Sequence, residues 1–272
     1  MGMRLHTFQL ISLLIAVSLA ASIRAAAAGP IKVVVLGAST AAGKNLDWDP
    51  GCPGSSPSPN ACTDMTWVAA NSWVGRFAVY LSTSAPGSTV VNLAVPGYAT
   101  CKGLPTGDTS GSCAPDAARN VTAAIAAGAD GIILSYPGND VSSGFGVDEA
   151  LANTQAIVNA AAAAGIPAWV ATSQPNNAAT AAQLAQLIDQ RNRTLSTFGS
   201  RALDFWSPLA TPADALDPAV SLFQNFHPSD QTHPNAEGHR RLYMQAAAAD
   251  IPGILSPPAD LPPARPKNLH VR

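Results

Sequence analysis

Short apolar stretches rich in β-branched residues alternate along this 272-residue chain with Ala-rich stretches of helical periodicity. The apolar stretches, which have the length of buried strands, lie at 31–36, 89–95, 131–136, 167–172 and 201–206. The stretches with helical periodicity lie near 66–83, 115–127, 147–164, 178–198 and 235–249. Successive strands that are joined by helices run parallel, and the helices cover both faces of the sheet. The alternation therefore predicts an α/β fold with a doubly covered parallel sheet.

Two long insertions interrupt the alternation, at 45–65 and at 96–114. Each of them follows a predicted strand, so each should lie at the carboxyl end of the sheet. Open α/β sheets bind their ligands at that edge. We therefore expect the functional site among these insertions and the turns beside them.

The first 28 residues have the pattern of a signal peptide. Arg4 and His6 precede the apolar run "LISLLIAVSLAAS", and the small residues of "RAAAAG" follow it. The alternative is a membrane anchor, but the apolar run is shorter than the roughly 20 residues that a membrane span needs. We expect cleavage near Ala28, a secreted or periplasmic protein, and no stable membrane anchor.

The remainder of the chain is long enough for one large domain, which we place at 29–251. The Pro-rich stretch "PPADLPPARPK" indicates that 252–272 is an extended tail or linker. Acidic residues outnumber basic ones, 17 to 15, and the chain has no basic run. This charge balance argues against nucleic acid, and against an anionic membrane surface, as the main partner.

The four cysteines, Cys52, Cys62, Cys101 and Cys113, all follow the predicted signal peptide. An even number of cysteines in an exported protein indicates two disulfides, for which three pairings are possible. We favour Cys52–Cys62 and Cys101–Cys113, because each pair then closes a segment rich in Gly, Pro and Ser. A zinc site is the less favoured alternative, since the spacing does not contain paired Cys-x-x-Cys ligands.

The stretch "VVVLGASTAAGK", 33–44, is a buried strand that ends in a turn of small residues carrying Ser39. It is not a phosphate-binding P-loop, because five residues separate Gly37 from Gly43 and no Ser or Thr follows Lys44. It also lacks the Gly-x-Ser-x-Gly pattern of α/β-hydrolases, since residue 41 is Ala. The turn either exposes a nucleophilic serine or simply reverses the chain.

A second group of polar residues lies in "PSDQTHPNAEGH", 228–239. Asp230 and His233 are three residues apart on a turn before a predicted helix, so the carboxylate can reach the imidazole Nδ1 and leave Nε2 facing outward. The alternative is a helix-capping Asp beside a surface His. A metal site that includes His227 and His239 is less favoured, and we expect these two residues to be structural or on the surface.

Two further turns follow predicted strands. In "SYPGND", Asn139 is an uncharged side-chain donor suited to an oxyanion, and Asp140 could cap or brace the turn. In "NLAVPGYAT", Gly97 could present an unshielded backbone N–H. For both stretches an ordinary turn is the alternative.

The order Ser, Gly, Asn and Asp-x-x-His along 31–250 resembles the SGNH (GDSL-type) hydrolase superfamily, most specifically in "DQTHPNAEGH". The resemblance implies a three-layer, flavodoxin-like α/β/α sandwich with a parallel sheet of about five strands. Two positions depart from the family pattern. Gly-Asp-Ser reads Gly-Ala-Ser, with Ala38 in place of Asp, and Gly-x-Asn-Asp reads Pro-Gly-Asn-Asp, with Pro137 in place of Gly.

Carried over by position, the resemblance makes Ser39 the nucleophile, His233 the base and then the acid, and Asp230 the carboxylate that orients it. The oxyanion hole would consist of the Ser39 N–H, the Gly97 N–H and the Asn139 side-chain amide.

The function that the resemblance implies is that of a secreted serine esterase, which hydrolyses short-acyl esters, chiefly acetyl esters, through an acyl-enzyme. Neither a cofactor nor a metal is expected. The expected partner is a small-molecule or polysaccharide ester, and the expected state is a monomer. One alternative is a lipase, lysophospholipase or arylesterase of the same superfamily. A catalytically silent carbohydrate-binding module is an alternative of a different class, but it would lack triad residues, and none is missing here.

Overall fold

The computed structural model describes most of the predicted domain. The described residues are 29–46, 49, 51–53, 62, 64–211, 215–217, 220 and 230–256. The predicted signal peptide, most of the predicted tail, part of the first insertion and His227 lie outside the described residues.

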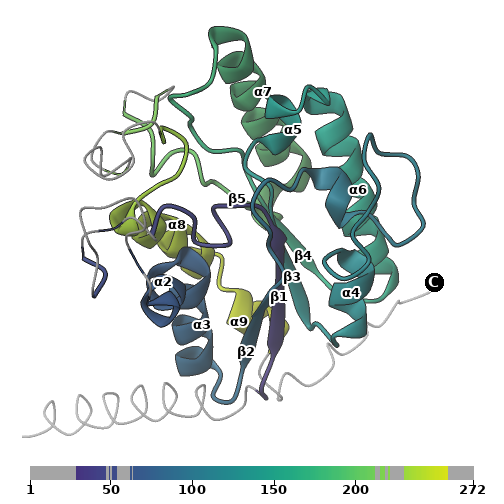
Figure 1. The fold of residues 1–272 in the computed structure, drawn as a ribbon. Helices are drawn as coiled ribbons and strands as arrows, with labels where there is room; N and C mark the ends of the chain where they lie inside the picture. Colours follow the sequence, from purple (N-terminus) through teal and green to yellow (C-terminus); the bar gives the residue numbers. More distant parts are fainter. Residues whose placement is uncertain are drawn as a thin grey trace, which may run out of the picture.

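The five strands form one parallel sheet in the order β2-β1-β3-β4-β5 (Figure 1). They are β1 (Lys32–Gly37), β2 (Thr89–Asn92), β3 (Gly131–Ser135), β4 (Ala168–Ala171) and β5 (Ala202–Leu203). Each strand falls within or one residue beyond a predicted apolar stretch. The α/β fold class is confirmed, and the strand order is that of flavodoxin-like folds.

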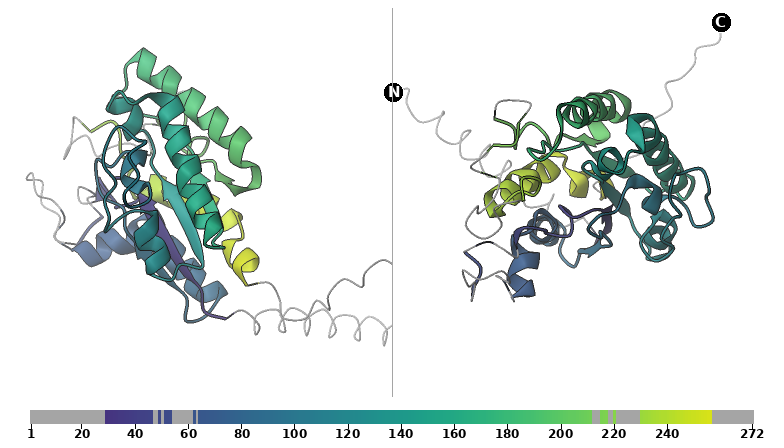
Figure 2. Two further views of the ribbon diagram at one scale, coloured as in Figure 1. Left: turned by 90° about the vertical axis from the view of Figure 1, so that its right-hand side faces the viewer. Right: turned by 45° about the horizontal axis from the view of Figure 1, so that its top comes forward.

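Helices cover both faces of the sheet, as the alternation predicts (Figures 1 and 2). One face carries α2 (Met65–Asn71), α3 (Trp73–Ser84), α8 (Ala236–Ala248) and α9 (Ile251–Leu255). The other carries α4 (Val121–Ala126), the short α5 (Asn139–Ser142), α6 (Gly146–Ala163) and α7 (Ala181–Phe198). Two 3₁₀ turns, η2 (Thr100–Gly103) and η3 (Gly199–Arg201), complete the described elements. The result is the three-layer sandwich that the resemblance implies.

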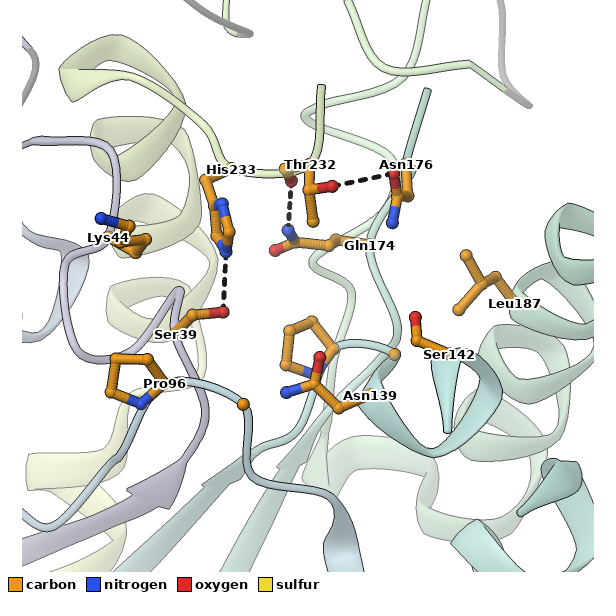
Figure 3. Close-up of a pocket in the computed structure, with 13 residues that line it drawn as sticks. Ser39, Lys44, Pro96, Asn139, Ser142, Gln174, Asn176, Leu187, Thr232 and His233 are labelled. Atoms are coloured by element: carbon orange, nitrogen blue, oxygen red, sulfur yellow. Dashed lines mark hydrogen bonds between the residues drawn. The ribbon is translucent and has the colours of Figure 1, made fainter. Parts of the chain in front are cut away.

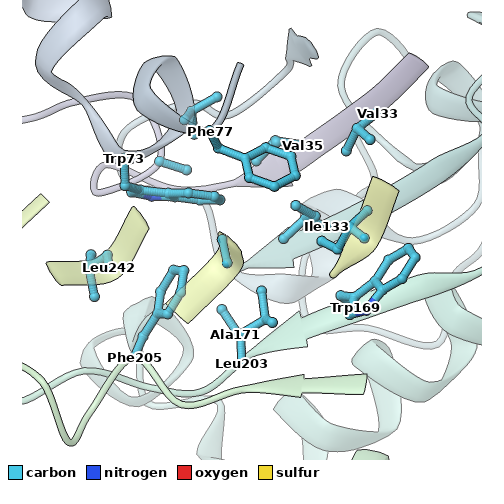
Figure 4. Packing of buried hydrophobic residues seen from close by; sticks show 14 of the residues in the cluster. Val33, Val35, Trp73, Phe77, Ile133, Trp169, Ala171, Leu203, Phe205 and Leu242 are labelled. Carbon is cyan, nitrogen blue, oxygen red and sulfur yellow. The ribbon is translucent and has the colours of Figure 1, made fainter. Parts of the chain in front are cut away.

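The central strand β1 divides the core into two apolar layers. Val33 and Val35 belong to the layer that α3, α8 and α9 cover, whereas Val34 and Leu36 belong to the layer beneath α4 and α6. All four side chains are fully buried, because successive residues of a strand point to opposite faces. Figure 4 shows the first of these layers, in which aromatic side chains of α3 pack over the sheet. Burial on both faces explains the continuous apolar sequence of β1.

The predicted helix at 66–83 is two helices, α2 and α3, that meet at Ser72. Ser72 has an extended backbone, and its side chain accepts a hydrogen bond from the Gly75 N–H, so it caps the second helix. A Cβ at Gly75 would lie 1.8 Å from the Ala69 carbonyl oxygen. The lack of a side chain at that position permits the sharp junction.

The predicted helix at 115–127 is shorter than expected. It begins at Val121, because the Asn120 side chain accepts from the Ala123 N–H and caps it there. Residues 115–120, which precede it, are not helical and continue the second insertion, within which Cys101 and Cys113 form a disulfide. The other disulfide joins Cys52 to Cys62, so both bonds have the predicted pairing.

The folded domain continues beyond the boundary predicted at residue 251. Residues 251–255 form α9, whose Pro252 occupies the first turn, where a missing N–H costs nothing. Leu255 packs against the core. The predicted tail therefore starts later than the proline content of the sequence suggests. Among the helices described, none is long and apolar enough to cross a membrane.

Candidate active site

Ser39 lies where β1 leaves the sheet. The Ala38 N–H donates to the Ser135 carbonyl of β3, after which the chain turns and the Lys44 N–H donates to the Ser39 carbonyl. A Cβ at Gly37 would lie 2.5 Å from the Ser135 oxygen, so only glycine permits this approach of the two backbones. The small residues of the turn thus bring Ser39 to the carboxyl edge of the sheet.

The imidazole of His233 bridges Asp230 and Ser39, and Figure 3 shows its contact with Ser39. Its Nε2 lies 2.8 Å from the Ser39 Oγ, and its Nδ1 lies 2.9 Å from the Asp230 Oδ2. A carboxylate only accepts hydrogen bonds, so it selects the tautomer with the proton on Nδ1. Nε2 is then left with a lone pair to accept the Ser39 proton.

The carboxylate of Asp230 is oriented by its own turn. Its Oδ1 accepts from the backbone N–H groups of Thr232 and His233 at 2.9 and 3.1 Å. Burial acts to raise the pKa of Asp230, but the hydrogen bonds from the His233 ring and from these N–H groups outweigh it. The pKa therefore lies below its ordinary value, and the group is ionised at neutral pH.

Gly97, in the turn after β2, and Asn139, the first residue of α5, both line the cavity at the carboxyl edge of the sheet. Residues 95–98 form a type II turn, with Pro96 and Gly97 at its centre, a φ of 85° at Gly97 and a hydrogen bond from the Tyr98 N–H to the Val95 carbonyl. Within the described part of the chain, the N–H groups of Gly97 and Ser39 have no hydrogen-bond acceptor. Both are therefore open to a ligand.

The Asn139 amide is held in place by one of its two N–H groups. Its Nδ2 donates to the Tyr98 carbonyl at 2.9 Å, which leaves the second N–H for another acceptor. The next residue, Asp140, is fully buried and accepts from both the N–H and the hydroxyl of Thr100. Burial raises the pKa of Asp140. Asp140 therefore braces the turn, which is one of the two roles expected for it. Its hydrogen bonds with Thr100 connect α5 to η2.

A cavity of about 320 Å³ opens above Ser39. The residues that line it are Ser39, Lys44, Pro96, Gly97, Pro137, Gly138, Asn139, Ser142, Gln174, Asn176, Leu187, Thr232 and His233. Most of these side chains are polar, and Leu187 of α7 supplies the one open-chain aliphatic group among them (Figure 3). The predicted nucleophile, base and oxyanion donors thus share one cavity.

Gln174 and Asn176 also line the cavity, although no sequence motif marks them as site residues. Both follow β4, whose carboxyl end lies at the same edge of the sheet as those of β1 and β3. The one sequence feature that could have pointed to them is the polar stretch "SQPNN", which directly follows a buried strand. It has no characteristic spacing, so only its place at the sheet edge could have identified it.

Of the two other histidines considered for a metal, the described one, His239, does not join the site. His239 is completely buried and its Nδ1 accepts from the Trp73 N–H at 3.2 Å, which makes it structural. Burial lowers the pKa of His239 to about 3, although a backbone hydrogen bond at Lys44 acts in the opposite direction. His227 lies outside the described residues. Among the residues that are described, no three His, Cys, Asp or Glu side chains form a metal-binding group.

These groups together can carry out acyl transfer. A hydroxyl hydrogen-bonded to a neutral imidazole that a carboxylate orients is an activated nucleophile. Open N–H donors beside it can stabilise the negative charge of a tetrahedral intermediate.

A model of the GDSL-like lipase/acylhydrolase family matches residues 35–241, which include all of these groups. A comparison with curated proteins finds no match.

Solved structures share the fold at low sequence identity. A lipolytic protein of the G-D-S-L family from Desulfitobacterium hafniense DCB-2 is 17% identical, with a TM-score of 0.54, and the match covers 80% of this chain and 98% of that one. The psychrotrophic esterase EstA from Pseudoalteromonas sp. is 12% identical, with a TM-score of 0.52 and coverages of 80% and 95%. The acetyl xylan esterase AlAXEase is 13% identical, with a TM-score of 0.50 and coverages of 81% and 100%.

The buried His239 should make the stability of the fold depend on pH. Its pKa in the folded state is about 3, against an ordinary value of 6.5, so the unfolded chain binds more protons between these values. Stability should therefore fall as the pH decreases through this window, with a slope from this one group of up to about 1.4 kcal/mol per pH unit. His239→Gln should flatten the dependence. Urea unfolding of both proteins between about pH 6 and about pH 4 measures it; equal slopes would contradict the assignment.

Proposed function

Because the chain belongs to the GDSL-like lipase/acylhydrolase family and is a carboxylic ester hydrolase, we propose that it removes short acyl groups, chiefly acetyl, from esters of carbohydrates. The observation that carries the proposed mechanism is the hydrogen-bonded series from the Ser39 Oγ through His233 to Asp230, with distances of 2.8 and 2.9 Å. These three residues are proposed as the catalytic triad.

In the proposed mechanism the Ser39 Oγ attacks the ester carbonyl carbon while the His233 Nε2 takes the hydroxyl proton. The carbonyl oxygen becomes an oxyanion, which accepts hydrogen bonds from the N–H groups of Ser39 and Gly97 and from the Asn139 amide. As the C–O bond to the alcohol breaks, His233 returns its proton to the leaving oxygen. Water then repeats the sequence on the acyl-enzyme and releases the carboxylic acid.

The polar side chains that interrupt the lining of the cavity support a short acyl group. Each methylene that leaves water for an apolar wall contributes about 0.8 kcal/mol, so an enzyme for long acyl chains needs an extended apolar lining. Here the apolar side chains of the lining are Leu187 and the rings of Pro96 and Pro137, and the other side chains that line it are polar. A long chain would gain little from such a lining, which argues against the lipase alternative.

The wall between α5 and the loop after β4 supports a polar alcohol such as a sugar. The Asn176 Oδ1 accepts from the Thr232 hydroxyl and from the Ala178 N–H, so the amide nitrogen is directed into the cavity (Figure 3). The hydroxyl of Ser142 also faces the cavity. These groups can donate to and accept from sugar hydroxyls. A structural neighbour is an acetyl xylan esterase, which fits this proposal.

Export is the remaining part of the proposal. The predicted signal peptide at 1–28 and the disulfides Cys52–Cys62 and Cys101–Cys113 are both typical of an oxidising compartment. Polysaccharide esters are found outside the cytoplasm, so export and the proposed substrate agree. A silent binding module would not need the Ser39–His233 contact, and the intact contact favours the enzyme.

Replacement of the nucleophile tests the mechanism. The wild-type protein should hydrolyse p-nitrophenyl acetate and be labelled covalently by a fluorophosphonate, since both reactions need an activated serine. Ser39→Ala should lose both. Ser143→Ala, which changes an exposed serine next to the site, should retain both. Mass spectrometry of the labelled protein identifies the modified residue, and labelling of Ser39→Ala would refute the assignment.

The oxyanion role of Asn139 predicts a defect in turnover. Removal of one donor costs roughly 2.7–4 kcal/mol of transition-state stabilisation, so Asn139→Ala should lower kcat by about 10²–10³. Asn139→Asp keeps the shape but replaces the donor with an acceptor, and should be at least as impaired. Steady-state kinetics with p-nitrophenyl acetate measure the effect. Normal turnover of either variant would remove Asn139 from the mechanism.

Acyl length separates an esterase for short chains from a lipase. We expect kcat/KM to fall from p-nitrophenyl acetate through the butyrate to the octanoate, by about tenfold or more overall, because added methylenes find no continuous apolar wall. Acetate release from acetylated xylan oligomers tests the carbohydrate part. Rising kcat/KM with chain length would favour the lipase alternative.

A further inference from the structure

Gln174 is a buried glutamine at the centre of the site whose role the triad does not explain. It lies three residues beyond the end of β4, and the residue is 2% exposed. Figure 3 shows it between His233 and the loop that carries Asn176, above Ser39. A buried side-chain amide is costly unless its polar atoms are paired, so its hydrogen bonds show what it holds.

The side chain of Gln174 joins the nucleophile turn to the histidine turn. Its Oε1 accepts from the hydroxyl of Thr40, which follows the nucleophile directly, at 3.1 Å. Its Nε2 donates to the carbonyl of Thr232, which precedes the base directly, at 2.9 Å. The two partners are therefore the immediate neighbours of Ser39 and His233.

The backbone of Gln174 contacts a third part of the site. Its N–H donates to the Pro137 carbonyl at 3.2 Å, two residues before the oxyanion donor Asn139. One residue thus touches the nucleophile turn, the oxyanion turn and the histidine turn. Two nearby residues also hold the histidine turn: Asn176 accepts from the Thr232 hydroxyl, and the Asn177 N–H donates to the Gln231 carbonyl.

The orientation of the Gln174 amide is determined by its surroundings. A carbonyl oxygen can only accept, so the Thr232 carbonyl requires the NH₂ group of the amide. The amide oxygen then faces Thr40, whose hydroxyl can rotate to donate. The opposite orientation would place two acceptor oxygens against each other at Thr232. The hydrogen bonds consequently have one direction, from Thr40 to Gln174 and from Gln174 to Thr232.

We infer that Gln174 is a positioning residue, which holds the turns of Ser39 and His233 at the separation that proton transfer needs. The inference rests on the proposed function. Ser39 and His233 are 194 residues apart in the sequence, so their 2.8 Å contact depends on how two separate turns are held. A misplacement of about 1 Å can cost about 10²-fold in rate. Loss of the amide should therefore impair the chemical step more than substrate binding.

Gln174→Met tests the inference, because methionine has a similar length but no amide donor or acceptor. Active sites are counted by the burst of p-nitrophenol on reaction with a p-nitrophenyl phosphonate, and kcat is expressed per counted site. We expect kcat per site to fall about 10- to 100-fold, with KM changed less than about threefold. The matched control is Gln190→Met, which alters another buried glutamine that does not line the cavity, and kcat per site should stay unchanged.

A second variant, Thr40→Val, tests the same inference and replaces Gln174→Met as the test if that variant fails to fold. It removes the hydroxyl that donates to Gln174 and should lower kcat per site about 3- to 10-fold. The variant that carries both substitutions should have the same kcat per site as Gln174→Met alone, because both changes break the same connection. Unchanged kcat per site in both single variants, or independent multiplication of their effects, would overturn the inference. If the wild-type protein neither reacts with the phosphonate nor hydrolyses esters, the proposed function itself fails.

Discussion

The parallel pairing of β1 with β3 is the interaction on which the rest of the site depends. In its register Gly37 lies opposite Ser135, and the Ala38 N–H extends the ladder by one further hydrogen bond. Both strands therefore end at the same level, and the turns that follow place Ser39 and Asn139 on one edge. A register shifted by one residue would reverse the faces of the strand, so the buried apolar residues of β1 and β3 also determine where these polar groups lie.

Beyond this edge the backbone carbonyls of the loops no longer accept hydrogen bonds from neighbouring strands. Side-chain amides donate hydrogen bonds to several of them instead. Asn92 donates to the Ala41 carbonyl, Asn45 to the His233 carbonyl, and Asn139 to the Tyr98 carbonyl. Each amide pairs a loop carbonyl that would otherwise lose its hydrogen bond on burial. The loops are thereby held rigidly while the N–H groups of Ser39 and Gly97 stay open. The same use of neutral amides suits a chain in which only 12% of the residues are charged.

Sequence reasoning identified the features that depend on local patterns. Apolar runs located the strands, and a spacing of three residues identified Asp230 and His233 as a pair. It missed features that depend on contacts between distant segments. The break at Ser72 interrupts a stretch whose apolar period continues, and Gln174 acquires its role only when Thr40 and Thr232 come together from distant parts of the chain. A single sequence cannot predict such a contact, because none of the three segments has a distinctive pattern of its own.

The two departures from the family pattern have structural explanations. Ala38 is fully buried among the apolar side chains beneath α4 and α6, where a carboxylate would need a partner. Proline at 137 forgoes the next hydrogen bond of the β1–β3 ladder. In the register of β1 and β3, the N–H of residue 137 would be directed at the Ala38 carbonyl, which instead accepts from the Ala42 N–H of the nucleophile turn. The nucleophile turn thus uses the acceptor that ends the ladder. Because the Ala38 carbonyl is already paired, the proline leaves no buried acceptor at the end of β1 without a partner.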